Sequence, residues 1–244
     1  MNLTNLTRRR LLSGMGVAGI TSMTGLALAT ERSLGFTETT TIQSVDGVTL
    51  SADWRETYNG RVLEDTRITP TESGAVLSLD NLMPGDSGVL SVRLSVQSED
   101  EEESPQVEPR LTFQLTETSE HGLTEPEQTV GDTSAETGEL QEFLTAAIWY
   151  DTGLASIDAF GANNSVQDLG EQLIRDDAEG TLAAVASAVD DVSLTPAGCL
   201  GVDESVTVSL GWSFDEDSAG VDAAQGDSVT FNYLIDSHHC ATNE

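Results

Sequence analysis

The stretch "NLMPGDSGVLSVRLSVQ", residues 81–97, decides the fold class because it places a turn directly before a strand. Pro84, Gly85 and Asp86 have turn chemistry: proline presets φ, glycine accepts a positive φ, and aspartate can bond to its own backbone. From Leu90 to Gln97 apolar and polar residues alternate, which is the period of a strand with one buried and one wet face. This stretch therefore predicts an all-β fold built from turns and half-buried strands.

Six further segments alternate in the same way, and turn residues separate them. Strands at this density favour a sandwich or a jelly roll. We expect one domain, residues 45–244, with the fold of a jelly-roll-like β-sandwich. The six segments are Val48–Trp54, Ala75–Leu79, Leu111–Leu115, Leu144–Tyr150, Val206–Phe214 and Val229–Ile235.

Two segments with helical spacing interrupt the strands and predict a helical insertion at about 165–190. The first is "NNSVQDLGEQLIRDD", which starts at residue 163 and offers Ser165 as a cap. The second is "TLAAVASAVDD", which follows Thr181 in the same way. The acidic run 98–109 and the long polar stretch 117–142 are expected to be surface loops. The apolar positions with helical spacing are Val166, Leu169, Leu173 and Ile174 in the first segment and Leu182, Val185 and Val189 in the second.

The first 29 residues have the pattern of an export signal. Arg8 and Arg9 stand before a short apolar stretch rich in glycine and alanine, which ends in Ala27-Leu28-Ala29. The arginine pair resembles a twin-arginine signal, with cleavage expected after Ala29. The alternative is an uncleaved anchor, although the apolar stretch is short for a membrane span. We expect a secreted protein, extracellular or on the cell surface, without a membrane span in the mature chain.

Acidic side chains dominate the composition. The 244 residues include 42 Asp and Glu, and all ten basic residues are arginines, which gives a formal net charge of −32. A charge of this sign excludes nucleic acid and anionic lipid as natural partners. Molar salt screens the self-repulsion, because the Debye length is then only about 3 Å, so the composition is typical of a halophile's surface. Disorder is the alternative, but 38% apolar residues in regular alternation indicate a folded body.

The two cysteines predict a disulfide. Cys199 precedes the Val206–Phe214 strand, and Cys240 follows the strand that ends at Ile235. If these two strands pair antiparallel, both cysteines lie at the same end of the hairpin. An exported chain favours their oxidation, while two free buried thiols are the alternative.

The sequence contains few residues arranged in catalytic motifs, and we expect that the protein is not an enzyme and binds no cofactor. It contains no H-E-x-x-H, no G-x-S-x-G and no glycine-rich phosphate loop. His121 has no second histidine at ligand spacing. Neighbouring side chains diverge in His238-His239-Cys240, so these three residues do not indicate a metal site. Pairs of carboxylates are uninformative, because 42 acidic residues produce many by chance.

Calcium and glycosylation remain open expectations. The oxygen-rich segments 215–227 and 151–158 could bind calcium, although neither has the spacing of an EF-hand loop. Asn163 begins the one glycosylation sequon after residue 29. The alternative is that Asn163 only leads into the expected helix cap.

Four motifs in order resemble one known family. They are "DWRETYNG" (53–60), "LSLDNLMPGDSGVLSVRL" (77–94), "AAIWYDTG" (146–153) and "QGDSVTFNYLI" (225–235). Their succession resembles the secreted TasA/camelysin family, above all its haloarchaeal members with SipW-type signal peptides. The resemblance implies a jelly roll with helical insertions and assembly into extracellular fibres. It also implies that an N-terminal segment of one subunit completes the sheet of the next. The chain lacks the aromatic segment that commonly ends the family's signals, and nothing in it resembles a zinc protease site.

The resemblance makes residues 30–44, "TERSLGFTETTTIQS", the candidate donor strand, with Phe36 and Ile42 as apolar anchors. Head-to-tail strand addition does not close on itself, so it grows a filament. The alternative is that this segment pairs within its own subunit or stays disordered. We therefore expect a structural subunit of a filament or biofilm matrix, with itself or related subunits as partners. The rival function is a monomeric module that binds a glycan or a surface protein through its loops, with Trp149 and Trp212 as candidate exposed aromatics.

Overall fold

The computed structural model describes residues 35–45, 48–98, 105–133, 137–153, 161–195 and 198–240. The expected signal with Arg8, Arg9 and the cleavage site after Ala29 lies outside the described residues, as do residues 30–34 of the candidate donor segment. None of the helices in the described part has the length and apolar character that crossing a bilayer requires.

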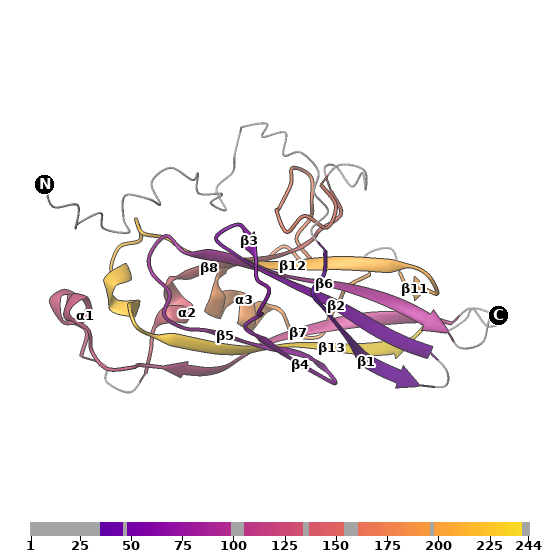
Figure 1. Cartoon of the computed structure of the whole chain (residues 1–244), viewed down its shortest axis with the longest axis horizontal. Helices are drawn as coiled ribbons and strands as arrows, with labels where there is room; N and C mark the ends of the chain where they lie inside the picture. The colour runs from indigo at the N-terminus through magenta and orange to yellow at the C-terminus, as the bar shows by residue number, and fades with distance from the viewer. Residues whose placement is uncertain are drawn as a thin grey trace, which may run out of the picture.

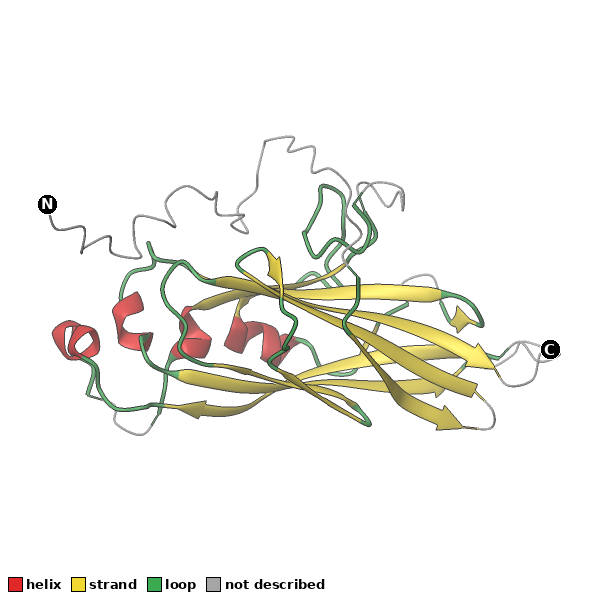
Figure 2. Cartoon of the chain, viewed as in Figure 1, coloured by secondary structure: helices red, strands yellow, loops and turns green. Residues whose placement is uncertain are grey.

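Two antiparallel sheets pack face to face as a sandwich (Figures 1 and 2). Sheet A has the order β1 (Glu38–Val45), β2 (Val48–Tyr58), β6 (Ser87–Ser98), β12 (Ser205–Phe214), β8 (Leu144–Tyr150) and β9 (Glu179–Thr181), and β3 (Arg61–Val62) also pairs with β2. Sheet B has the order β10 (Val192–Ser193), β7 (Gln106–Ser119), β13 (Ser228–His239), β5 (Gly74–Leu79) and β4 (Ile68–Thr71), and β11 (Leu200–Gly201) also pairs with β7. The sandwich and all seven predicted strands are therefore confirmed.

The order of the strands is jelly-roll-like because the chain repeatedly changes sheet. Strands β2, β6 and β8 belong to sheet A, whereas β5 and β7, which lie between them in sequence, belong to sheet B. Such crossings place consecutive strands on opposite sides of one shared core. The core is thus built from contacts between residues that are far apart in sequence.

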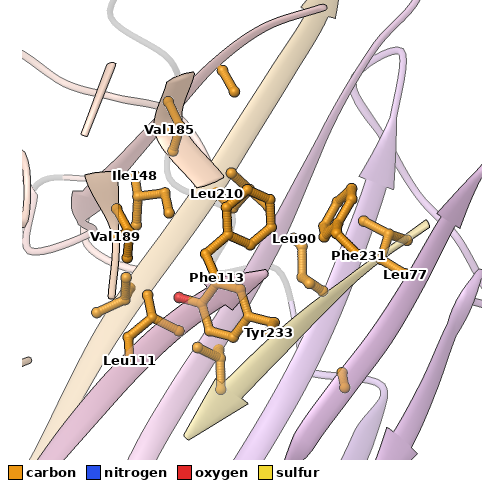
Figure 3. Close-up of a cluster of buried hydrophobic side chains, with 14 of the residues drawn as sticks. Leu77, Leu90, Leu111, Phe113, Ile148, Val185, Val189, Leu210, Phe231 and Tyr233 are labelled. Atoms are coloured by element: carbon orange, nitrogen blue, oxygen red, sulfur yellow. The ribbon is translucent and has the colours of Figure 1, made fainter. Parts of the chain in front are cut away.

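The core lies between the sheets and is rich in aromatic rings. Trp54 of sheet A meets Tyr233 of sheet B edge-on, with ring centroids 6.0 Å apart. Phe113 and Phe231, on neighbouring strands of sheet B, lie 4.6 Å apart in a similar arrangement. Figure 3 shows Phe113, Phe231 and Tyr233 in this core together with Val185 from a helix.

One of the two predicted helices is confirmed. Helix α3 (Leu182–Ala188) begins at Thr181, whose hydroxyl accepts a hydrogen bond from the Ala184 N–H at 3.2 Å. Its buried side chains, Leu182 and Val185, face the core at one end of the sandwich, where α2 (Leu140–Phe143) also lies between the sheets (Figure 2).

The other predicted helix, at residues 163–177, is wrong. Asn163 and Ser165 have positive φ, and Gly170 has a φ of 96°. Side chains there bond to nearby backbone, since Asn164 Oδ1 accepts from the Val166 N–H at 2.7 Å and Glu171 Oε2 accepts from the Asp168 N–H at 2.8 Å. Such local bonds compete with helix formation. The segment forms a loop over sheet A, and two of its apolar positions, Val166 and Leu169, are exposed.

The polar stretch 117–142 contains structure that the sequence analysis missed. It begins inside β7, and its later part holds α1 (Glu125–Val130) and α2 (Leu140–Phe143). Helix α1 has a capping box in which Thr124 and Glu127 each bond to the other's backbone N–H. The 3₁₀ helix η3 (Val221–Ala224) packs near α1.

The predicted disulfide forms, but its expected route is wrong. Strand β12 pairs with β6 and β8, whereas β13 pairs with β5 and β7, so the two strands belong to different sheets and make no hairpin. The beginning of β7 brings the cysteines together instead. Leu200, next to Cys199, pairs with Val107, and the Cys240 N–H donates to the Gln106 carbonyl at 3.0 Å. The two Cα atoms are 6.3 Å apart in the Cys199–Cys240 disulfide.

Candidate functional site

Strand β1, the core of the candidate donor segment, forms one margin of sheet A. It pairs antiparallel with β2 from Glu38 opposite Trp54 to Val45 opposite Val48. The register shifts between Thr41 and Gln43. In the single chain the segment thus completes its own sheet, which is one of the two alternatives that the sequence left open.

A few side chains fasten β1 and the residues before it to the sandwich. Ile42 is 7% exposed and belongs to the core. The Trp54 indole N–H donates to Thr40 Oγ1 at 2.9 Å. Phe36 is partly buried, and the guanidinium carbons of Arg55 and Arg93 lie 4.7 and 4.5 Å from its ring centroid. Cation–π contacts of this kind stabilise by about 0.5–2 kcal/mol each. Both predicted anchors therefore contact residues of their own chain.

Beneath the 161–175 loop, the outer face of sheet A carries a buried polar cluster. Arg55 Nε donates to Ser165 Oγ at 2.9 Å, and Arg55 Nη2 lies 3.9 Å from Asp151 Oδ2. The same Asp151 oxygen accepts from Ser209 Oγ at 3.0 Å, and Ser209 Oγ lies 2.7 Å from Ser91 Oγ. All five residues are buried.

Hydrogen bonds and the attraction between the two charges oppose the cost of burying Asp151 and Arg55. Burial raises the pKa of the Asp151 carboxyl, and hydrogen bonds from Ser165, Ser209 and Asn164 oppose that rise. Burial likewise lowers the pKa of Arg55, and the Asp151 charge opposes that fall. Arg55 donates to hydroxyl oxygens, Asp151 accepts from backbone N–H and hydroxyl groups, and the two charges lie close to each other. The cluster therefore holds the loop against sheet A, where the Phe36 ring also contacts Arg55.

The glycosylation candidate Asn163 lies beside this cluster. Its side chain is partly buried and its φ is 59°. Ser165, which completes the sequon, is buried and bonded to Arg55. An enzyme that recognises the sequon would therefore need this loop to leave sheet A.

His121 lies apart from the adjacent His238 and His239, and the three histidines share no ligand site. His121 Nε2 is 2.9 Å from Ser228 Oγ. His238 and His239 are exposed neighbours on β13 and so point to opposite faces of the sheet, and Cys240 is in the disulfide. Within the described ranges, neither group of side chains spaced to hold a metal ion contains a histidine.

The two segments expected to bind calcium have different surroundings. In the segment 151–158, the carboxylate of the described Asp151 lies close to Arg55 and accepts hydrogen bonds from the backbone of the loop.

In the segment 215–227, Asp215 Oδ1 accepts a hydrogen bond from the Asp217 N–H at 3.0 Å. Asp227 alone enters a cluster of carboxylates with Glu120 and Glu127. Glu120 and Glu127 were not predicted as partners of Asp227, because they lie in the stretch 117–142 that was expected to be a surface loop. The capping-box spacing of Thr124 and Glu127 is the signal that could have found part of the cluster.

Both tryptophans proposed as exposed binding residues are buried. Trp149 is 2% exposed and Trp212 is 1% exposed, and Trp212 lies in the core. In the part of the chain that the structure describes, the large exposed hydrophobic residues include no aromatic one.

No family model and no curated protein matches the sequence.

Proposed function

We propose that this chain is an exported structural subunit that forms filaments by exchanging β1 between neighbouring subunits. One observation carries the proposal: β1, which lies in the segment that follows the expected cleavage site, is a long strand at the margin of sheet A. Because β1 pairs with β2 alone, it can leave without disturbing the other strands, and the edge of β2 that it uncovers can accept β1 of another chain by strand addition.

A comparison of the sheet margins favours β1 as the exchanged element. The other marginal strands are shorter, and β4 contains Pro70, which lacks an N–H and so blunts its edge. Strand β1 has eight residues, no proline, and mostly β-branched side chains, which suit a sheet. The margin made by β1 is therefore the one best suited to pairing between chains.

Exchange would preserve the contacts that β1 makes. The backbone ladder to β2, the core position of Ile42 and the hydrogen bond from Trp54 to Thr40 can all form with β2 of a neighbour. Only the short connection between Val45 and Val48 would need to extend. Because exchange from each subunit to the next is head-to-tail, it produces an open chain of subunits.

The rival function, a binding module with exposed aromatic residues, has less support. Its two candidate residues, Trp149 and Trp212, are inside the protein. Stacking of a sugar ring needs an exposed aromatic face, so the described surface does not favour a glycan site of this type.

A disulfide across β1 and β2 tests the exchange. Thr41 and Ser51 face each other in the sheet, so the Thr41→Cys/Ser51→Cys variant can lock β1 to its own β2. We expect the mature wild-type chain to form filaments in molar salt under electron microscopy. The oxidised variant should remain monomeric, and mild reduction should restore assembly.

The control places a disulfide in the interior of sheet B. Ser78 and Thr230 lie on paired strands, with their hydroxyl oxygens 3.0 Å apart, so Ser78→Cys/Thr230→Cys cross-links strands that do not exchange. This control should assemble in both its oxidised and its reduced form. Assembly of the reduced control also shows whether reduction of the Cys199–Cys240 disulfide affects filament formation. Filaments from the oxidised β1–β2 variant would contradict exchange. A wild-type chain that stays monomeric at every salt concentration would contradict the function itself.

A further inference from the structure

Helix α1 lies at one end of the sandwich (Figure 1). Three carboxylates from distant parts of the chain converge there. Glu120 follows the last residue of β7, Glu127 lies in α1, and Asp227 precedes the first residue of β13. One oxygen from each side chain lies within 4.8 Å of the others. Asp132 and Glu139 form a second such group with Glu120, so further carboxylate oxygens lie close by.

Burial distinguishes this cluster from the acidic surface. Glu127 is 0% exposed and Asp227 is 1% exposed. Each uses one oxygen locally: Glu127 Oε2 accepts from the Thr124 N–H, and Asp227 Oδ2 accepts from the Glu139 N–H at 2.6 Å. Glu127 Oε1, Asp227 Oδ1 and both oxygens of Glu120 accept no hydrogen bond from an N–H or a hydroxyl group of the described residues, and the Glu120 and Asp227 carboxyls lie close enough to share a proton.

Such an arrangement favours a compensating positive charge, which either a proton shared by Glu120 and Asp227 or a bound cation supplies. Across the described residues, the ion pairs involve other carboxylates and none of these three. A buried carboxylate without a partner costs several kcal/mol, and buried charges in proteins are paired or coordinate metals. A bound cation would supply the missing partner.

The local backbone is shaped for the close approach of these carboxylates. A Cβ on Gly226 would lie 3.8 Å from Glu127 Oε1, and Gly226 has a φ of 111°. A Cβ on Gly138 would lie only 2.9 Å from Asp227 Cγ. Glycine at position 138 therefore leaves space for the Asp227 carboxylate, whereas the contact at Gly226 would be an ordinary van der Waals one.

We propose that Glu120, Glu127 and Asp227 bind a calcium ion. Calcium takes six to eight oxygen ligands at about 2.3–2.6 Å, so oxygens on opposite sides of the ion are about 5 Å apart. Magnesium needs shorter distances and usually keeps several waters, and zinc prefers nitrogen and sulfur ligands. The ion would tie the end of β7, helix α1 and the start of β13 together.

Calorimetric titration of Ca²⁺ in molar KCl tests the site independently of filament formation when the mature chain carries the oxidised Thr41→Cys/Ser51→Cys pair, which keeps it monomeric. This chain serves as the wild type for the site, and the site variants are made in it. The high salt suppresses diffuse binding to the acidic surface. We expect one class of site, a higher melting temperature with Ca²⁺ than with EDTA, and a much smaller response to Mg²⁺. The Glu127→Gln/Asp227→Asn variant should bind Ca²⁺ at least about tenfold more weakly and lose the Ca²⁺-dependent rise in melting temperature.

The variant should still fold, because each amide keeps a carbonyl oxygen for the Thr124 or Glu139 N–H. Circular dichroism checks this, and Glu120→Gln, at a less buried position, provides a second variant with the same expected loss of binding. The control is Glu64→Gln/Asp65→Asn, which neutralises two exposed carboxylates and should leave the affinity unchanged. The site would be refuted by a wild-type chain without a calcium response, by unchanged affinity in both cluster variants, or by an equal response to Mg²⁺.

Discussion

Arg55 is buried on the outer face of sheet A, and its charge is balanced by Asp151 and by hydroxyl groups. The alternation of β6 and β12 predicted a wet face at Ser91 and Ser209, yet both serines are buried. The reason is a contact that strand periodicity does not encode. The loop around Ser165 folds over the sheet, and it does so through hydrogen bonds between residues more than 70 positions apart.

Truncation of Arg55 tests the energetic role of this cluster. Arg55→Ala would leave the Asp151 carboxylate buried without its cation, and such a loss typically destabilises by about 3–5 kcal/mol. We expect a decrease of this size in the free energy of unfolding, measured by urea denaturation at constant molar salt. Arg61→Ala, at an exposed position, should change stability by less than about 0.5 kcal/mol. Equal effects of the two substitutions would contradict the account.

Glu171 predicts how stability depends on pH. Its carboxylate is buried and accepts from the Gly153 N–H at 2.6 Å and from the Asp168 N–H at 2.8 Å. Burial raises its pKa from 4.5 to about 7, with smaller contributions from the Asp151 and Asp168 charges. Because the pKa of Glu171 is higher in the folded state than in the unfolded state, protonation of this carboxyl stabilises the fold. This contribution to the free energy of unfolding is complete below about pH 4.5 and is lost as pH rises through about 7. Because solvent screens this group, its contribution to the free energy of unfolding is about 1–2 kcal/mol.

The Glu171→Gln variant should therefore flatten the decline in stability between pH 5 and pH 8. Its absolute stability also falls, because the amide NH₂ faces a backbone N–H, so the pH slope is the quantity to compare. Glu179→Gln removes the same formal charge from an exposed position and should keep the wild-type slope. An unchanged slope in Glu171→Gln, obtained by denaturation at several pH values, would show that this carboxyl does not titrate in that range.

At the scale of elements, the strands could be predicted from the sequence but their partners could not. Seven strands follow from local alternation, because each buries one face in the core. The pairing of β12 with β6 and β8 depends on how the whole chain crosses between sheets. Strand β1 has few apolar residues, so alternation alone did not assign it to the chain's own sheet. The convergence of Asp227 with Glu127 likewise arises from tertiary structure, although the capping box at Thr124 is local.

The disulfide makes a prediction at this scale. Cys199 and Cys240 fasten β11 and β13 beside the beginning of β7, and 41 residues separate them in sequence. Closing a loop of this length stabilises by about 4 kcal/mol on the chain-entropy model. We expect the Cys199→Ser/Cys240→Ser variant to lose about that much free energy of unfolding in urea titrations. A loss below about 1 kcal/mol would show that the neighbouring strand pairings hold this end without the bond.

At the scale of the whole molecule, charge and topology act together. A formal net charge of −32 makes subunits repel one another in dilute buffer, so association needs screening by salt. Strand exchange adds specificity. The β1–β2 backbone hydrogen bonds and the core contacts of Ile42 must form with a neighbouring chain in the same way as they form within one chain. Assembly should therefore appear at high salt and place β1 of one chain against β2 of another.

Cross-linking between differently labelled chains measures this arrangement most directly. Thr41→Cys and Ser51→Cys are placed on separate chains, mixed, assembled in molar salt and mildly oxidised, because Thr41 and Ser51 face each other across β1 and β2. Ser78→Cys and Thr230→Cys on separate chains serve as the control, since β5 and β13 stay within one subunit. The account predicts disulfide-linked pairs containing one Thr41→Cys and one Ser51→Cys chain on non-reducing gels, and none from the control mixture. Filaments that yield no such mixed pairs would contradict the exchange of β1.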